Sequence, residues 1–330
     1  MQKILIIQTA FVGDVVLATA MIEKLYNSFP SAQLDILVRK GNEKLLTNNL
    51  KISNILIWDK KEDKIAHLFG ILKSIRKTKY DKVINLQRFF STGFLTAFSK
   101  GKQTIGFDKN PLSFLFSTKV KHSLDKGIHE VERNNELIAS FTNDTFFKPK
   151  LYPSAEDVEL VKKYKDQPYF TITPSSVWFT KQYPLQKWIV FIDSLPGEYK
   201  IYLLGGPENI EDADFILKGT INNSGVNLAG KLGFLQSAAL MKDAQMNYAN
   251  DSAPLHFASA VNAPVTAIFC STIPAFGFTP LSDRSFIVET KEVLNCRPCG
   301  IHGRSACPLG HFKCALTIHT DQLINTLNDA

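Results

Sequence analysis

The sequence predicts an α/β protein built from two doubly wound domains. Short apolar runs typical of buried strands alternate with segments whose apolar residues recur at helical spacing. This alternation stops once, in the Pro149–Pro153 stretch, and then begins again. The chain has 330 residues, of which 45% are hydrophobic and 21% charged, and this suits two ordinary soluble domains. Strands that alternate with helices indicate parallel sheets covered on both faces.

The N-terminal half, residues 1–155, contains the first set of elements. Lys3–Gln8 is a buried-strand run, and residues 14–29 form an amphipathic helical pattern that Pro30 ends. The other strands and helices that we predict in this half are Leu34–Val38, Ile55–Trp58 and Lys82–Leu86, and Asp63–Lys77 and Ile128–Phe141.

The C-terminal half, residues 156–330, repeats the pattern. Its predicted strands are Tyr169–Thr173, Lys200–Leu204, Val226–Leu228, Gln245–Tyr248 and Val265–Phe269. Its predicted helices are Leu185–Ser194, Glu208–Leu217, Phe234–Lys242 and Ser252–Val261. Ligands of doubly wound sheets bind beyond the carboxyl ends of the strands. Two facing domains would therefore direct both sets of strand ends toward one cleft.

The most informative motif is Asn250–His256, which lies between a predicted strand and a predicted helix. Asp251 or Ser252 is a suitable N-cap, and a helix tolerates Pro254 in its first turn. Helix starts of this kind bind phosphates through unbonded N–H groups and the positive end of the helix dipole. The motif therefore predicts a nucleotide or diphosphate ligand.

Two further polar corners follow predicted strands. Gly13, which allows close approach of the backbone to a ligand, precedes Asp14, which either stabilises the helix start or takes part in chemistry. Glu208 follows a Gly-Gly-Pro turn, where a carboxylate can accept hydrogen bonds from ribose hydroxyls. Ordinary capping at Asp14, which is common, and a plain turn with a helix start at Glu208 are the alternatives.

A fourth corner follows the strand Tyr169–Thr173 and contains Ser175, Ser176, Thr180 and Lys181. Hydroxyl groups and a lysine suit a diphosphate, because the ammonium group would stabilise charge that develops on a departing phosphate. A polar loop without chemistry is the alternative.

Basic and aromatic residues are concentrated between Arg88 and Lys121. This segment holds six basic residues, one acidic residue and seven phenylalanines, while the whole chain has a net charge of +7. One interpretation is core phenylalanines beside solvated lysines. The other is a surface for an anionic amphiphile or for membrane head groups. We do not expect nucleic acid as a partner, because no known nucleic-acid motif is present.

The cysteines are unevenly distributed. Cys270 lies alone in an apolar run, and the other four are clustered as Cys296, Cys299, Cys307 and Cys314. Reduced structural thiols, a metal site and disulfides are the three interpretations of the cluster, and a cytosolic location would disfavour disulfides. No apolar run is long enough to span a membrane, and Asp14 interrupts the N-terminal apolar run, so we expect no signal peptide.

In their order and spacing, these motifs resemble glycosyltransferase family 9, the bacterial lipopolysaccharide heptosyltransferases. The resemblance runs nearly end to end. It is carried by Phe11–Thr19, Lys181–Pro184 with Trp188, Leu203–Glu208, Asn227–Lys231, Asn250–His256 and the cysteine-bearing tail through Cys314.

The resemblance implies a GT-B architecture, in which two Rossmann-like domains face each other. It implies an inverting transfer of heptose from ADP-heptose, bound mostly by the C-terminal domain, to the inner core of lipopolysaccharide, bound by the N-terminal domain. The reaction would occur in the cytoplasm, at the periphery of the inner membrane, and would require no cofactor besides the nucleotide-sugar substrate.

The resemblance also assigns roles to residues. By position, Asp14 is similar to the general base, and Lys181 with Ser175 and Ser176 is similar to the diphosphate ligands. The remaining residues expected at the donor site are a nucleoside contact at Glu208, the adenine neighbours Lys231 and Leu232, the sugar and phosphate corner Asp251, Ser252 and His256, and the adjacent Gly13, Thr180 and Ala253.

One departure from the family pattern concerns Ala253, which stands where the family commonly has glycine. Its Cβ could crowd the phosphate or the sugar, so a relative with another nucleotide sugar or another glycan acceptor is an alternative. A Rossmann oxidoreductase is disfavoured, because the chain lacks the Gly-x-Gly-x-x-Gly fingerprint. A non-catalytic nucleotide-binding protein is the third possibility.

Overall fold

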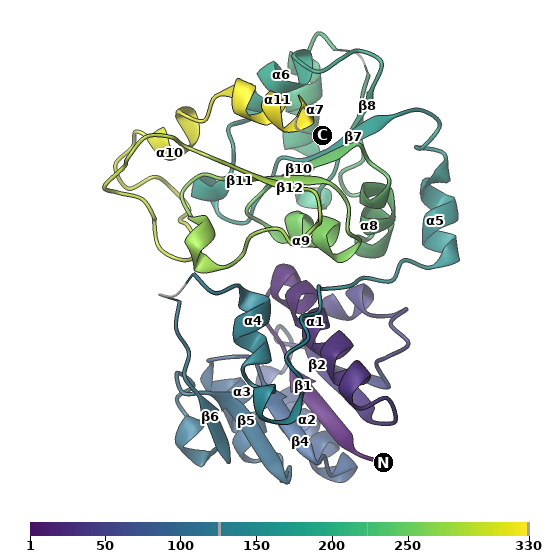
Figure 1. Cartoon of the computed structure of the whole chain (residues 1–330), viewed down its shortest axis with the longest axis vertical. Helices are drawn as coiled ribbons and strands as arrows, with labels where there is room; N and C mark the ends of the chain where they lie inside the picture. Colours follow the sequence, from purple (N-terminus) through teal and green to yellow (C-terminus); the bar gives the residue numbers. More distant parts are fainter. Residues whose placement is uncertain (125–126, 223, 329–330) are drawn as a thin grey trace. The chain divides into compact units, whose positions relative to one another are not determined.

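The computed structural model describes residues 1–124, 127–222 and 224–328. It divides into two compact units, Met1–Tyr152 and Pro153–Ala330, so the division falls within the proline-bounded stretch that interrupts the sequence pattern. Each unit contains a six-stranded sheet in which every pair of neighbouring strands is parallel (Figure 1). The predicted α/β fold class with two doubly wound sheets is confirmed.

The N-terminal unit has the strand order β3-β2-β1-β4-β5-β6. Its strands are β1 (Lys3–Ile7), β2 (Gln33–Arg39), β3 (Asn54–Trp58), β4 (Lys82–Asn85), β5 (Gln103–Phe107) and β6 (Thr118–Val120). Its α-helices are α1 (Val12–Ser28), α2 (Lys64–Thr78), α3 (Phe90–Ala97) and α4 (Glu130–Asn135). Short 3₁₀ turns are present at η1 (Asn42–Leu45), η2 (Ser113–Leu115) and η3 (Ala139–Phe141).

The predicted helix Ile128–Phe141 is wrong in its length. The α-helix ends at Asn135, after which the N–H groups of Leu137 and Ile138 bond to carbonyls three residues back. Two consecutive asparagines, which are weak helix formers, stand at this end of the helix. The sequence did not predict strand β5, and the reason again lies in its local sequence. It contains Gly106, against which the Phe116 ring packs so closely that a Cβ would lie 2.6 Å from it.

The C-terminal unit has the strand order β12-β11-β10-β7-β8-β9. Its strands are β7 (Tyr169–Thr173), β8 (Lys200–Leu203), β9 (Gly225–Asn227), β10 (Met246–Asn250), β11 (Val265–Phe269) and β12 (Ser285–Glu289). Its α-helices are α5 (Ala155–Lys162), α6 (Leu185–Asp193), α7 (Ile210–Gly219), α8 (Phe234–Lys242), α9 (Ala253–Ala260), α10 (Lys313–Leu316) and α11 (Thr320–Asn328). Its 3₁₀ turns are η4 (Phe179–Lys181), η5 (Pro207–Asn209) and η6 (Pro274–Phe276).

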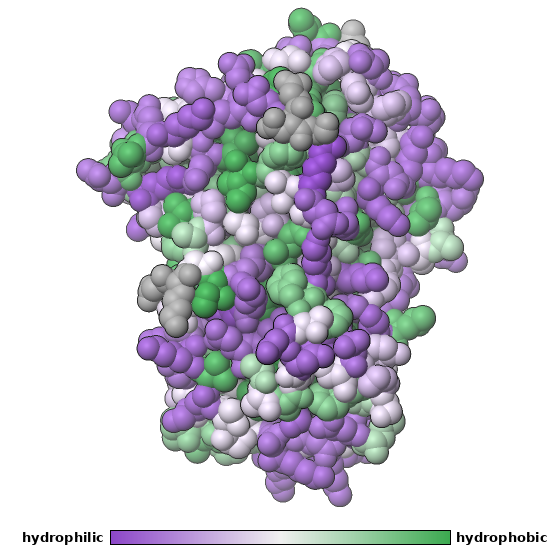
Figure 2. All heavy atoms as spheres, in the orientation of Figure 1, coloured by the Kyte–Doolittle hydropathy of each residue, from purple (hydrophilic) through white to green (hydrophobic). Residues whose placement is uncertain are grey.

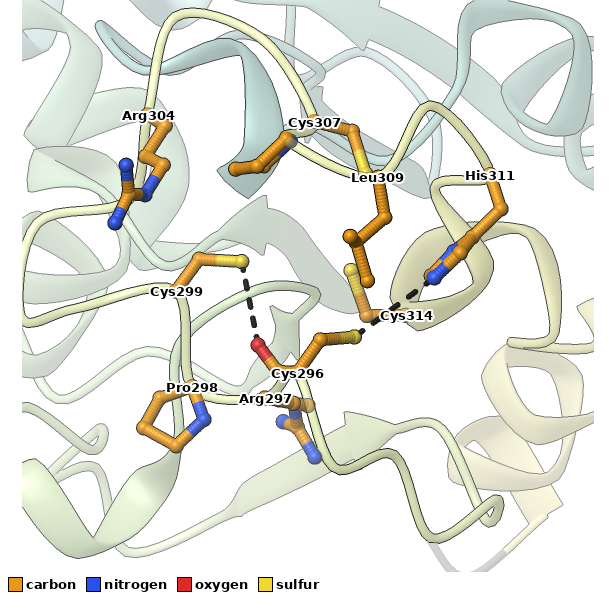
Figure 3. Close-up of a pocket in the computed structure, with 10 residues that line it drawn as sticks. Cys296, Arg297, Pro298, Cys299, Arg304, Cys307, Leu309, His311 and Cys314 are labelled. Atoms are coloured by element: carbon orange, nitrogen blue, oxygen red, sulfur yellow. Dashed lines mark hydrogen bonds between the residues drawn. The ribbon is translucent and has the colours of Figure 1, made fainter.

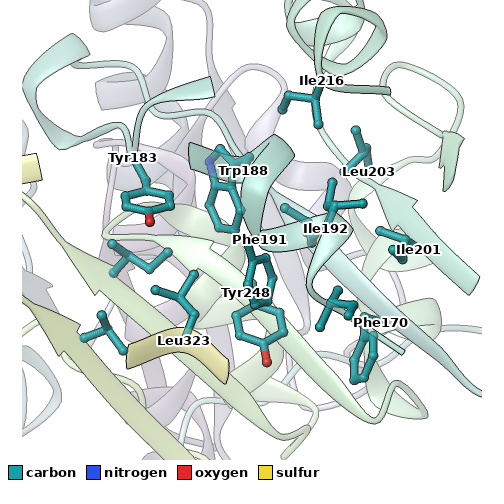
Figure 4. Packing of buried hydrophobic residues seen from close by; sticks show 14 of the residues in the cluster. Phe170, Tyr183, Trp188, Phe191, Ile192, Ile201, Leu203, Ile216, Tyr248 and Leu323 are labelled. Atoms are coloured by element: carbon teal, nitrogen blue, oxygen red, sulfur yellow. The ribbon is translucent and has the colours of Figure 1, made fainter. Parts of the chain in front are cut away.

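An aromatic cluster holds α6 against the C-terminal sheet (Figure 4). The Trp188 and Phe191 ring centroids lie 5.9 Å apart, and Phe191 meets Tyr248 of β10 edge to face at 4.6 Å. All three side chains are fully buried. Such pairs add about 0.5–1.5 kcal/mol to the stabilisation from burial. They fix the position of the segment that leads into α6 from the end of β7.

The strand order reverses at the same place in both sheets. The chain builds outward from the first strand of each unit to one side, then returns to place the fourth strand on the other side. The reversal points therefore lie between β1 and β4, and between β7 and β10. Ligands of doubly wound sheets bind beyond the strand ends at these points. Three of the predicted polar corners follow β1, β7 and β10.

None of the helices in the described part of the chain is both long enough and apolar enough to cross a bilayer. Hydrophilic side chains cover much of the face seen in Figure 2, with apolar patches between them.

Candidate active site

Asn250, the last residue of β10, joins the two corners at the reversal point of the C-terminal sheet. Its side chain is fully buried. The amide nitrogen donates to the Pro174 carbonyl at 2.6 Å, and the amide oxygen accepts from the N–H of Tyr183 at 2.9 Å. The Ser175–Lys181 corner is thus held at both ends by one residue of the Asn250–His256 motif. Buried amides with both functions bonded specify one loop arrangement.

Lys181 and Asp251 form an ion pair at this corner. Lys181 Nζ lies 2.8 Å from Asp251 Oδ2, and the two side chains are only 14% and 8% exposed. The Thr272 hydroxyl donates to the same carboxylate oxygen at 2.6 Å. The structure thereby brings together two residues that the sequence assigned to different motifs. It adds Thr272, for which the sequence offered no signal.

Thr180 is buried beneath this pair. Its hydroxyl accepts from the Ser271 hydroxyl at 3.0 Å and from the N–H of Arg304 at 2.8 Å. Its own N–H donates to the Arg304 carbonyl at 3.0 Å. The sequence predicted a direct donor contact for Thr180. That contact stays a prediction, and the hydrogen bonds show that Thr180 anchors the η4 turn that contains Lys181.

Helix α9 begins at Ala253 with Ser252 at the N-cap position. The Ser252 hydroxyl does not cap the helix but points to the carbonyls of Ser175 and Asn250, at 3.4 and 3.3 Å. It therefore does not compete with an anion for the N–H groups of the first turn. His256 is buried in this turn, and Ala253 and Ser175 are partly exposed beside it.

The loops after β8 and β9 meet at the neighbouring strand ends. The N–H of Gly230 donates to the Gly205 carbonyl at 2.9 Å, and a Cβ on Gly230 would lie 3.1 Å from the Pro207 Cα. Glu208 and Lys231 project from these loops and are exposed, while Leu232 is half-buried. The Lys231 ammonium bonds to the Asn227 carbonyl at 2.8 Å. These contacts do not show where an adenine would bind. The assignment of Lys231 and Leu232 as adenine neighbours therefore stays a prediction.

In the N-terminal unit, Asp14 lies in the first turn of α1. Its carboxylate accepts from the Phe11 N–H at 3.1 Å. Its charge acts on Glu130, whose side chain is 13% exposed and pairs with Arg133 at 2.8 Å. Burial raises the pKa of Glu130, Arg133 opposes the rise, and the negative Asp14 adds to it. Asp14, the predicted base, therefore lies near the charged residues Glu130 and Arg133, where α1 and α4 pack together.

Lys60, which follows β3, is a further polar residue that the sequence gave no reason to select, and it reaches Thr9 beyond the end of β1. Its ammonium bonds to the carbonyl and hydroxyl of Thr9 at 2.8 and 3.0 Å. Burial and the neighbouring Arg39 and Lys64 lower the pKa of Lys60 to about 8. Gly13, the residue before Asp14, is partly exposed in α1.

Four cysteines line one pocket of about 250 Å³ together with Arg297, Arg304 and His311 (Figure 3). The cysteines that line it are Cys296, Cys299, Cys307 and Cys314. All of them are free thiols, so the disulfide interpretation is wrong. In the described residues, no three Cys, His, Asp or Glu side chains are grouped as metal ligands would be. The metal interpretation stays untested.

Comparison with known proteins decides the family. Residues 68–306, more than half of the chain, match glycosyltransferase family 9 (heptosyltransferase). The chain belongs to this family. It is a glycosyltransferase, as the resemblance in the sequence implied. The match covers the corners that follow β7, β8, β9 and β10, and it does not assign a role to any single residue.

Family 9 relatives cover most of the chain. Lipopolysaccharide heptosyltransferase 3 of Escherichia coli is 29% identical over 277 residues, which are 79% of this chain and 82% of that protein. The solved family 9 glycosyltransferase of Veillonella parvula is 19% identical, with a TM-score of 0.87 over 100% of this chain and 98% of that one. The solved structure of E. coli ADP-heptose LPS heptosyltransferase II is also 19% identical. Its TM-score is 0.82, over 99% of this chain and 98% of that one. These structural likenesses show that the GT-B fold is shared.

Replacing Lys181 by alanine tests the predicted diphosphate corner. We expect binding of inorganic pyrophosphate to weaken at least about tenfold, the scale of one charge-assisted hydrogen bond. The variant loses one cation and also leaves the Asp251 carboxylate uncompensated next to the anion. Isothermal titration calorimetry measures the change. Lys162→Ala, on exposed α5, is the matched control and should bind as the unmodified protein does. Equal affinities in the two variants would remove Lys181 from the corner.

Proposed function

We propose that this family 9 glycosyltransferase transfers heptose from ADP-heptose to the inner core of lipopolysaccharide. The proposal rests on the family match and on the names of the relatives, which are lipopolysaccharide heptosyltransferases. The observation that carries it within the structure is the Lys181–Asp251 pair at the reversal point of the C-terminal sheet. A cation in this position, beside the start of α9, suits the diphosphate of a nucleotide sugar.

The proposed reaction is a single inverting displacement. Asp14 accepts the proton of the acceptor hydroxyl while that oxygen attacks the anomeric carbon of the donor sugar. The bond from that carbon to the diphosphate breaks, and ADP departs with the bonding electrons. Lys181 and the N–H groups at the start of α9 stabilise the charge on the departing phosphate. The leaving group is a weak base, so the scheme needs no acid to protonate it and no metal or other cofactor.

Ser175, Ser176 and Asp251 complete the proposed donor contacts. The two serines are partly exposed at the end of β7, where their hydroxyls can reach phosphate oxygens. In the donor complex, Asp251 shares Lys181 with the diphosphate and offers its second oxygen to a hydroxyl of the sugar. Glu208, Lys231 and Leu232 remain the proposed contacts of the nucleoside.

Asp14→Asn tests the proposed base. Turnover should fall by at least ~10²-fold, a typical contribution of general-base catalysis, because the amide cannot accept the proton. Binding of ADP should stay unchanged, since the residue acts on the acceptor. A coupled assay of ADP release and calorimetry with ADP measure the two quantities. Near-normal turnover in the variant would assign the base to another group.

The identity of the donor is tested with a panel of ADP- and UDP-sugars and a heptose-free inner-core acceptor. We expect turnover with ADP-heptose, detected as a heptose mass increase of the acceptor. Ala253, where the family commonly has glycine, is the reason to include other sugars. Turnover with a different sugar alone would retain the enzyme class and overturn the donor. Binding of ADP without turnover of any donor would favour a non-catalytic nucleotide-binding protein.

We further propose that the enzyme works in the cytoplasm, in peripheral contact with the anionic inner membrane. Four of the seven phenylalanines between Arg88 and Lys121 support this contact, because they are 42–70% exposed: Phe89, Phe90, Phe98 and Phe114. The six basic residues of the segment are exposed as well. Two of the remaining rings, Phe107 and Phe116, are buried and belong to the core.

Vesicle flotation tests this contact. The protein should bind vesicles that contain anionic phospholipid at low salt, and the bound fraction should fall as the salt concentration rises. Phe114→Ser combined with Lys109→Gln should reduce binding. Phe215→Ser, which removes a half-exposed ring from α7 of the other unit, should not. Binding that is absent at low salt, or equal in both variants, would contradict the proposed surface.

A further inference from the structure

The loop between β12 and α10, residues 290–312, lies against the turn that carries Lys181. All of its residues are described, and none is in a helix or strand. Long connections of this kind in compact domains commonly serve a functional site. The proposed function leaves this loop without a role, although it contains three of the four clustered cysteines.

One end of the loop is held by the residues that follow β11. The Arg297 guanidinium donates to the carbonyls of Cys270 and Thr272 at 2.8 and 2.7 Å. The N–H of Cys299 donates to the Ser271 carbonyl at 2.9 Å. Thr272 is the residue whose hydroxyl holds Asp251. This part of the loop is therefore attached to the segment that holds Asp251, the acidic member of the Lys181–Asp251 ion pair.

The other end of the loop is attached to the basic side. Arg304 exchanges two hydrogen bonds with Thr180, one from each backbone N–H. Phe312 stacks on Phe179 of the same turn, with ring centroids 5.0 Å apart. The loop thus connects the η4 turn with the segment after β11, and the hydrogen bond between Thr180 and Ser271 joins the two directly.

Gly303 is the point of closest approach. Its backbone has φ +77°, and a Cβ placed on it would lie 2.9 Å from Lys181 Cγ, 3.3 Å from Lys181 Cδ and 3.0 Å from Thr180 Oγ1. The aliphatic stem of Lys181 therefore runs directly over the Gly303 backbone. A methyl group there would displace the stem and with it the ammonium group that pairs with Asp251.

We propose that Gly303 is a positioning residue, and that the 290–312 loop sets the direction in which Lys181 presents its ammonium group to the donor diphosphate. The inference rests on the proposed diphosphate role of Lys181. It adds a residue whose effect passes through the lysine rather than through contact with the substrate.

Gly300 in the same loop provides a matched control. Its φ is +76°, so alanine there suffers the same backbone strain, but no atom lies within 4 Å of its added Cβ. Both variants should therefore have a lower melting temperature, and that of Gly303→Ala should fall further because its methyl group also meets Lys181 and Thr180. Only Gly303→Ala should weaken ADP binding, by about tenfold, as expected when one charge-assisted contact is lost. Equal ADP affinities in the two variants would overturn the positioning role.

A double-mutant cycle separates this inference from the proposed function. If Gly303 acts through Lys181, Gly303→Ala should add nothing to the loss caused by Lys181→Ala. Additive losses would mean that Gly303 affects the site independently. No effect of Lys181→Ala on ADP binding would overturn the diphosphate role itself, and the inference with it.

Thr180 supplies a second test, which also serves if Gly303→Ala does not fold. Thr180→Val keeps the shape but removes the hydroxyl that accepts from Ser271 and Arg304, and ADP binding should weaken. Thr180→Ser keeps the hydroxyl and should restore binding. Equal ADP affinities in the valine and serine variants would show that the loop does not position Lys181.

Discussion

The candidate donor site depends on the buried contact between Lys181 and Asp251. Removing two charges from water costs more than an isolated contact returns, so such a pair persists only with good geometry and additional hydrogen bonds. Thr272 supplies the added bond to the carboxylate, and the turn anchored by Thr180 supplies the geometry. A pair of this kind contributes little to stability, but it holds a cation ready for an anionic ligand. In the donor complex that we propose, the diphosphate takes over part of the role of Asp251.

The fold explains why these residues meet. Parallel strands present their carboxyl ends at one edge of a sheet, and reversal of the strand order makes β7 and β10 neighbours although about 75 residues separate them. Asn250 joins the corners that follow these strands, and the 290–312 loop packs against the η4 turn. In the N-terminal unit, the charge of Asp14 acts on Glu130, and Lys60 binds Thr9 just beyond the end of β1.

Local patterns explain what the sequence could predict. The apolar strand runs, the helix start at Ser252 and the family motifs are all contiguous, and contiguous motifs were sufficient to predict the fold class and the family. Strand β5 contains Gly106, and α4 ends at two asparagines, so neither follows a simple apolar period. Thr272, Lys60 and Gly303 escaped prediction for another reason. Their importance arises from contacts with residues far away in the sequence, as in the bond between Thr180 and Ser271, 91 residues apart.

A crystal structure of the enzyme with bound ADP tests the central claim most directly. The account predicts that the β-phosphate lies beside the start of α9, with one of its oxygens about 3 Å from the Lys181 ammonium nitrogen. Lys181 should still run over Gly303, and Asp251 should keep its bond from Thr272. ADP bound elsewhere, or a β-phosphate held without Lys181, would contradict the assignment of this corner as the donor site.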